Sequence, residues 1–240
     1  WSSDVCSSDL KMVANRGARV LLEVQGPLKP LMATLKDVAE VYVRGGSLPA
    51  FDYQCPLLSL PLAFDTRLET IPASIPYLGA VVETARHWQE RLPRDNSLKV
   101  GISWSGSVTN LNDRNRSVSL QNFLKFAASS VSLVSLQKDV RPDDRRILDA
   151  HPEILDFSAD LKDFSDTAAL IENLDLVISV DTSVAHLAGA MGKPVWVLVP
   201  FAPDWRWLLN RDDSPWYPTA RLFRQEKRRS EEHTSELQSH

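Results

Sequence analysis

The feature that most constrains the fold of this chain is a regular alternation of short apolar runs and helix-like segments between residues 98 and 199. Runs rich in Val, Ile and Leu are typical of strands buried on both faces, and connections of helical length join parallel strands. We therefore predict a doubly wound α/β domain in this stretch. Its expected strands are Leu98–Trp104, Val131–Leu136, Asp175–Val180 and Pro194–Val199, and its expected helices are Leu120–Ala128, Pro142–Ala150, Ser165–Leu174 and Thr182–Met191.

A shorter α/β pattern precedes this domain. Arg19–Val24 and Val41–Val43 are apolar runs that predict strands, and the apolar spacing of Pro27–Val38 between them predicts a helix. This order is typical of a βαβ unit with parallel strands. The prolines of Phe51–Tyr77 predict a loop with short elements, and we expect Gly79–Leu92 to be a helix that ends at a polar hinge.

The two ends of the chain, WSSDVCSSDL (Trp1–Leu10) and RSEEHTSELQSH (Arg229–His240), are Ser-rich and resemble nothing between them. One oligonucleotide, read on opposite strands, encodes both tracts, and it resembles a sequencing-library adapter. We interpret both tracts as adapter-derived and set them aside when we predict the fold. This interpretation implies that the remaining residues are an internal piece of a longer protein.

Composition narrows the function classes. Between the two tracts the chain carries 26 basic and 26 acidic residues, so its charge gives no reason to expect nucleic acid or an anionic membrane as a partner. Only Cys55 remains there, which excludes a disulfide framework and fits a reducing compartment, so we expect a cytoplasmic protein. No apolar run reaches the roughly 18–20 residues of a membrane span.

The strongest candidate for chemistry follows the strand Asp175–Val180. Asp181 comes directly after this strand, and its carboxylate could cap the helix that begins there. Thr182 and Ser183 would present hydroxyl and N–H groups at the start of that helix, where the helix dipole favours a diphosphate. His186 lies one turn further on and could donate to a phosphate or sugar oxygen, although a lone histidine is as often a structural residue.

Two other strand ends carry weaker candidates. The first strand runs into a loop with small residues, and Gly101, Ser105 and Gly106 would let backbone N–H groups approach an anion. Arg116 could supply a forked donor to a phosphate, and Lys138 could contact a phosphate or ribose. Both could equally be ordinary surface residues, and the loop lacks the Lys-Ser/Thr pair that completes a P-loop.

The loop after Pro194–Val199 contains Trp205, Arg206 and Trp207, whose aromatic rings could stack on a base or sugar or could cover the core. No spacing of Cys and His residues predicts a metal site, and no serine has the His/Asp context of a catalytic triad. The residues alone leave open a nucleotide-binding protein, an epimerase or a transferase.

Six sequence blocks resemble the heptosyltransferase-like glycosyltransferases of family 9, and in particular bacterial proteins that carry this domain behind tetratricopeptide repeats. In chain order the blocks are Val100–Gly106, Asn112–Ser117, Ser135–Lys138, Asp166–Leu170, Asp175–Ala190 and Pro200–Trp207. The resemblance implies a GT-B fold, in which two Rossmann-like domains face each other across a cleft. It divides this chain into a truncated N-terminal, acceptor-side domain (residues 11–78), a linker helix and hinge (79–97) and a C-terminal, donor-side domain (98–228).

The resemblance also implies a nucleotide-diphosphate sugar as donor. Asp181, Thr182 and His186 would contact it, with the Gly101–Gly106 loop and Lys138 nearby. Arg206 is included in this donor site, as is Ser183, where the family often has glycine. The implied transfer inverts the anomeric carbon and uses no bound metal or other cofactor.

The family also has a Gly-rich N-terminal loop with a proposed acidic base, and Lys11–Tyr77 contains no counterpart, so no catalytic residue is assigned. We therefore expect a fragment of an inverting, metal-independent glycosyltransferase with an unknown acceptor. The alternatives are a non-catalytic module that binds a nucleotide or a protein partner, and a sugar-nucleotide epimerase.

Overall fold

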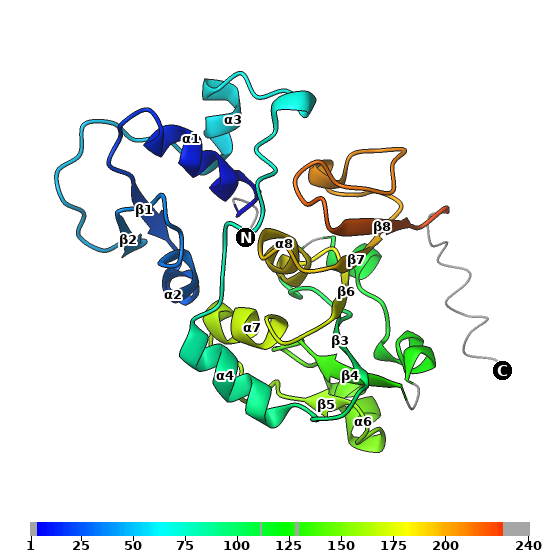
Figure 1. The fold of residues 1–240 in the computed structure, drawn as a ribbon. Helices are drawn as coiled ribbons and strands as arrows, with labels where there is room; N and C mark the ends of the chain where they lie inside the picture. The colour runs from blue at the N-terminus through cyan, green and yellow to red at the C-terminus, as the bar shows by residue number, and fades with distance from the viewer. Residues whose placement is uncertain (1–3, 111, 128–129, 228–240) are drawn as a thin grey trace.

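The computed structural model describes residues 4–110, 112–127 and 130–227, and one six-stranded parallel sheet organises them (Figure 1). The strands lie in the order β5-β4-β3-β6-β7-β8. From β3 the chain first adds β4 and β5 on one side and then β6, β7 and β8 on the other. Their bounds are β3 Leu98–Ser103, β4 Val131–Ser135, β5 Leu155–Asp156, β6 Leu176–Val180, β7 Val195–Val199 and β8 Ala220–Arg224. This order confirms the predicted doubly wound α/β domain.

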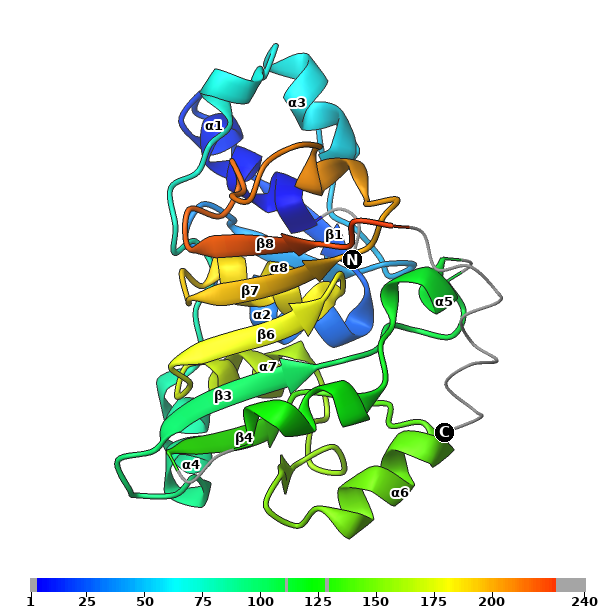
Figure 2. The same ribbon diagram turned by 90° about the vertical axis from the view of Figure 1, so that its right-hand side faces the viewer.

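Helices cover both faces of this sheet because alternate strand residues point to opposite sides (Figures 1 and 2). Val134 and Val177 belong to the hydrophobic cluster that contains the helices α4, α7 and α8. Leu133 and Ile178, their neighbours in sequence, belong to a second cluster on the opposite face, with α6 and the short turn η5. The bounds are α4 Val82–Arg91, α6 Pro142–Ala150, α7 Phe164–Ile171, α8 Ser183–Ala190 and η5 Leu120–Asn122.

The N-terminal region contains a second, two-stranded parallel sheet of β1 (Leu21–Val24) and β2 (Glu40–Val43). The turn η2 (Gly26–Leu28) and the helix α2 (Lys29–Met32) join the two strands. Residues of η2 and α2, including Leu31, lie in the same hydrophobic cluster as the residues of α7. The βαβ order is as predicted, and residues of this region belong to the same hydrophobic cluster as residues of the six-stranded sheet.

Two predicted helices are wrong in extent. The helix expected over Pro27–Val38 ends at Met32, after which the backbone N–H groups of Thr34 and Leu35 bond to carbonyls only three residues earlier. The Thr34 hydroxyl also donates to the Leu31 carbonyl. The helix expected over Leu120–Ala128 is instead two 3₁₀ turns, η5 and η6 (Leu124–Phe126), with hydrogen bonds that close after three residues. Ala128 itself lies outside the described residues.

Part of the tract Trp1–Leu10 packs against the rest of the chain, while its adapter-derived origin stays a prediction. Asp4–Asp9 form the 3₁₀ segment η1, which contacts α8 and the short helix α3 (Leu60–Ala63). Leu10 begins the next helix, α1 (Leu10–Ala14). Leu10 joins the main core. Two buried polar atoms, Ser7 Oγ and Asp9 Oδ1, have no hydrogen-bond partner among the described residues, so this packing carries a desolvation cost. The tract Arg229–His240 lies outside the described residues.

The remaining short elements are η3 (Leu57–Ser59), η4 (Leu68–Thr70), α5 (Asp113–Arg116) and η7 (Trp205–Trp207). The sequence patterns also missed β5, which has only two residues, and β8, in which two arginines interrupt the apolar run. Among the described residues, no helix is both long enough and apolar enough to span a membrane.

Asp9 provides a test of the N-terminal packing. Burial raises the pKa of Asp9 from 3.8 to about 6, so the folded chain prefers its neutral form. The stability that this preference contributes is present below pH 3.8 and is lost as the pH rises through about 6. Asp9→Asn should therefore raise the free energy of unfolding at pH 8 by on the order of 1 kcal/mol and leave it almost unchanged at pH 4.

Urea unfolding at the two pH values measures this effect. Asp52→Asn, which changes an exposed carboxylate, is the matched control and should change neither value. A chain that is less stable at pH 8 after Asp9→Asn would contradict the buried placement of η1.

Candidate functional site

The candidate site lies where the strand order of the sheet reverses, between β3 and β6. The two strands pair in parallel, with Ser103 opposite Ser179, so their carboxyl ends open side by side at one edge. In doubly wound sheets this reversal leaves a crevice outside the strand ends, in which ligands bind. The topology therefore brings the loop with Ser105 and Gly106 next to Asp181 and Thr182.

Arg116, on the short helix α5, bridges the two strand ends. Its Nη1 donates to the Asp181 carbonyl at 2.9 Å, and its guanidinium lies directly against Gly106. A Cβ atom at position 106 would lie 2.2 Å from Arg116 Nη2, so a larger residue there would displace the guanidinium from its place between the two strand ends.

A second arginine, which sequence reasoning missed, joins Arg116. Arg141 is ion-paired with the buried Asp113 through Oδ2, and Arg116 Nε lies 3.6 Å from the other oxygen, Oδ1. Arg141 Nη2 also donates to the Gly106 carbonyl at 3.3 Å. One carboxylate thus serves two guanidinium groups at the end of β3.

Gln137 is a further site residue that the sequence analysis passed over. Its Oε1 accepts from the backbone N–H of Ser105 at 3.2 Å and from the Ser103 hydroxyl at 3.4 Å, which holds the loop after β3. Ser105 Oγ is buried and has no partner among the described residues. The sequence signal for Gln137 was the position of this residue after β4, beside the more conspicuous Lys138.

Two predicted site residues lie elsewhere. Gly101 is inside β3, where a Cβ atom would lie 2.5 Å from Leu174 and 2.7 Å from Leu136, so it is a packing glycine of the core. Lys138 is exposed, and its Nζ donates to the carbonyl of Lys162 at the surface. Neither residue contributes a group to the crevice.

Asp181 does not cap α8 as predicted. Thr182 is the N-cap residue, and its side chain makes no capping bond; its hydroxyl lies 3.1 Å from the Ser179 hydroxyl instead. The Asp181 carboxylate accepts a hydrogen bond from the indole N–H of Trp207, with an Nε1–Oδ1 distance of 2.7 Å. The first-turn N–H groups of α8, which include that of Ser183, therefore have no side-chain cap.

His186 is enclosed by aromatic rings. Its ring stacks on Trp207, with centroids 4.9 Å apart, and its Nδ1 lies 3.3 Å from the Tyr217 hydroxyl. Its Nε2 is 3.9 Å from Asp181 Oδ1. Tyr217 fits there because residue 189 is glycine, since a Cβ atom at that position would lie 2.5 Å from the tyrosine ring.

Burial shifts the pKa values of the two groups in opposite directions, since it disfavours the charged form of each. Burial raises the pKa of Asp181, and the hydrogen bond from Trp207 counteracts that rise. Burial, with a further contribution from the positive charge of Arg206, lowers the pKa of His186 to about 3. At neutral pH the imidazole is therefore uncharged and can donate through only one of its ring nitrogens.

Arg206 is buried near Asp181 and His186. Its Nη1 lies 2.7 Å from Asp204 Oδ1, and its guanidinium lies over the ring of Trp205, 4.4 Å from the centroid. Asp204 also caps the 3₁₀ turn η7 through the backbone N–H of Arg206. Of the predicted residues, the structure thus gathers around one crevice Ser105, Gly106, Arg116, Asp181, Thr182, Ser183, His186 and Arg206.

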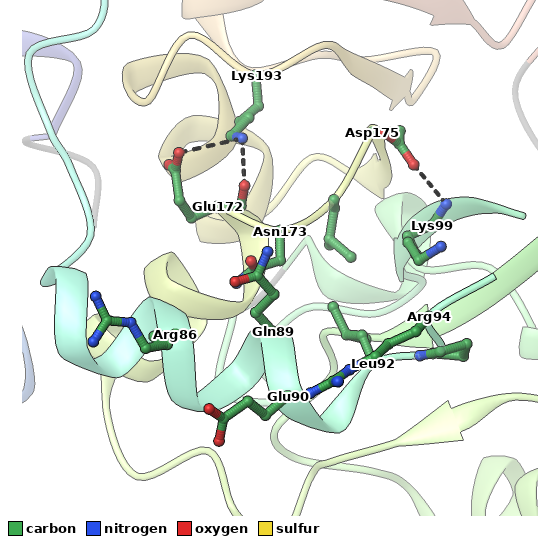
Figure 3. A pocket seen from close by; sticks show the side chains of 12 residues that line it. Arg86, Gln89, Glu90, Leu92, Arg94, Lys99, Glu172, Asn173, Asp175 and Lys193 are labelled. Atoms are coloured by element: carbon green, nitrogen blue, oxygen red, sulfur yellow. Dashed lines mark hydrogen bonds and ion pairs between the residues drawn. The ribbon is translucent and has the colours of Figure 1, made fainter. Parts of the chain in front are cut away.

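A cavity of about 760 Å³ lies at the opposite edge of the sheet (Figure 3). Its wall includes Lys99 and Asp175, which stand at the beginnings of β3 and β6, and the backbone N–H of Lys99 donates to Asp175 Oδ2 at 2.8 Å. Lys193 is paired with Glu172 at 3.5 Å. None of the predicted site residues lines this cavity, so it is not the site that the sequence predicted.

The strand order defines a doubly wound α/β chain. Two solved structures share its fold: the glycosyl transferase family 9 protein from Veillonella parvula DSM 2008, and the E. coli ADP-heptose lps heptosyltransferase II. The first has a TM-score of 0.64 at 12% identity, over 99% of this chain and 88% of that one. The second has a TM-score of 0.57 at 12% identity, over 91% of this chain and 86% of that one.

Residues 159–203, which contain α7, β6, α8 and β7, match Glycosyltransferase family 9 (heptosyltransferase). Protein FlbA from Caulobacter vibrioides is 27% identical over 183 residues, which are 72% of this chain. The chain spans 30% of the length of that relative. The chain therefore shares the fold of these two glycosyltransferase structures, and residues 159–203 match family 9, while the association with tetratricopeptide repeats stays a prediction.

The buried state of His186 can be tested by titration. Because its pKa lies at about 3, the imidazole carbon-bound proton signals should not shift between pH 7.5 and pH 5 in an NMR titration. The stability that depends on the neutral ring is present above the ordinary value of 6.5 and is lost as the pH falls toward 3. The free energy of unfolding should therefore fall by at most about 1.4 kcal/mol per pH unit in that window.

His186→Gln should flatten this acid dependence, whereas His87→Gln, which changes an exposed histidine of α4, should leave it as it is. A titration midpoint of His186 near pH 6 would rule out the enclosed, neutral imidazole.

Proposed function

We propose that this chain carries the donor site of a family 9 glycosyltransferase and binds the diphosphate of a nucleotide sugar in the crevice between β3 and β6. The observation that carries the proposal is the shared carboxylate of Asp113. Because Asp113 lies between Arg116 and Arg141, two guanidinium groups stand together at the mouth of the crevice, where both could donate hydrogen bonds to a diphosphate.

Other groups of the crevice support an anionic ligand. The uncapped N–H groups at the start of α8 point toward the strand ends and attract negative charge through the helix dipole. The buried Ser105 hydroxyl, which has no partner among the described residues, is a further donor for a phosphate oxygen. The neutral His186 would contribute a hydrogen bond and no charge.

The proposed reaction is a single displacement that inverts the anomeric carbon. An acceptor hydroxyl attacks that carbon, the bond to the diphosphate breaks, and a general base takes the hydroxyl proton. Arg116, Arg141 and the start of α8 would stabilise the negative charge that develops on the leaving diphosphate. The base and the acceptor are not assigned, and transfer is proposed for the whole protein of which this site is a part.

Binding of ADP tests the donor site, since the neighbouring E. coli structure is named for ADP-heptose. We expect ADP to bind with and without Mg²⁺ in isothermal titration calorimetry. Arg116→Ala should weaken binding at least tenfold, or about 1.4 kcal/mol, because it removes a charge-assisted donor. Arg146→Ala is the matched control: this exposed arginine of α6 pairs with Asp143 on the helix surface, and the affinity should not change.

Failure to bind ADP, UDP or GDP at millimolar concentration would contradict the proposal. Nucleotide binding without sugar transfer by the whole protein would favour a non-catalytic binding module. Release of an isomerised sugar nucleotide in the absence of any acceptor would favour an epimerase.

A further inference from the structure

The indole of Trp207 makes the closest side-chain contact of Asp181. The Nε1–Oδ1 hydrogen bond is 2.7 Å long, and both side chains are buried, with Trp207 only 1% exposed. A hydrogen bond to a carboxylate is strong in such surroundings, because water cannot compete for either partner. No other hydrogen bond of the described residues reaches the Asp181 carboxylate, so its orientation depends on this indole.

Trp207 is itself held in place from the opposite side. Its backbone carbonyl accepts from Arg224 Nη2 of β8 at 2.5 Å, and its backbone N–H donates to the Asp204 carbonyl at 3.1 Å. Its ring also stacks on His186 at an angle of 13°. A single side chain from the turn after β7 therefore sets two groups at the start of α8.

We propose that Trp207 is a positioning residue of the donor site, which orients the Asp181 carboxylate through its indole N–H. The inference rests on the proposed function, since Asp181 lies in the proposed donor crevice. The indole engages Oδ1 and leaves Oδ2 for a ligand. Aromatic packing alone would not do this, because a phenylalanine ring at the same place has no donor.

The charged and titratable groups around Asp181 come from three elements. Arg116 of α5 and Arg206 of η7 favour its ionised form, Asp204 opposes it, and His186 of α8 lies 3.9 Å away. Burial raises the pKa of Asp181, and the hydrogen bond from Trp207 is the strongest influence that lowers it. Loss of the indole N–H alone should therefore raise the pKa of Asp181 further.

Trp207→Phe separates the hydrogen bond from the packing, because it keeps an aromatic ring against His186 and removes only the donor. In an NMR titration of the ¹³C-labelled aspartate carboxyls, Asp181 should titrate at a higher pH than in the unaltered protein. ADP affinity, measured by calorimetry, should fall at least tenfold. Trp196→Phe, which changes a half-exposed indole on β7, is the matched control and should leave both quantities unchanged.

An unaltered Asp181 titration in Trp207→Phe would overturn the inference, as would ADP binding as tight as in the unaltered protein. Failure of the proposed function is distinct: the unaltered protein would then not bind ADP, while the rise in the pKa of Asp181 would remain. Should Trp207→Phe not fold, the ¹⁵Nε1 resonance of Trp207 in the unaltered protein decides. It must shift with the same midpoint as the Asp181 carboxyl, and independent midpoints would overturn the inference.

Discussion

The parallel pairing of β3 with β6 is the contact on which the candidate site depends. It joins β3, the first strand of the six-stranded sheet, to β6, and the strand order of the sheet reverses at that pair. Two loops that are far apart in the sequence thereby meet at one edge. The hydrogen bond between Arg116 and the Asp181 carbonyl joins these two loops.

Low solvent access accounts for the chemistry of the residues around Asp181. The same burial that leaves His186 neutral raises the pKa of Asp181, so an ionised carboxylate at this place needs local support. The indole of Trp207 supplies a hydrogen bond, and Arg116 and Arg206 supply positive charge. The aromatic rings at the start of α8 thus belong to the electrostatics of the site as well as to its packing.

The position of α8 also depends on the N-terminal region. Seven of the eight residues of α8 are buried, and the helix lies between the sheet and segments that include η1 and the residues before α4. Tyr77 and Leu78 donate their backbone N–H groups to the carbonyl of Ala190, the last residue of α8. Both regions share one hydrophobic cluster, so α8 packs against the N-terminal region as well as against the sheet.

The sequence by itself determined four of the six strands of the doubly wound sheet, β3, β4, β6 and β7, each only one residue longer than observed. It also determined that Asp181 follows β6 directly and that His186 lies on the next helix. Apolar runs and their spacing indicate which residues of a single segment are buried, so they predict secondary structure but not the contacts between segments. Only the tertiary structure decided the partners: Trp207 for Asp181, Arg141 beside Arg116, and Thr182 as the cap of α8. Those choices depend on which strand ends become neighbours and which side chains lose water together, and both are properties of the assembled sheet.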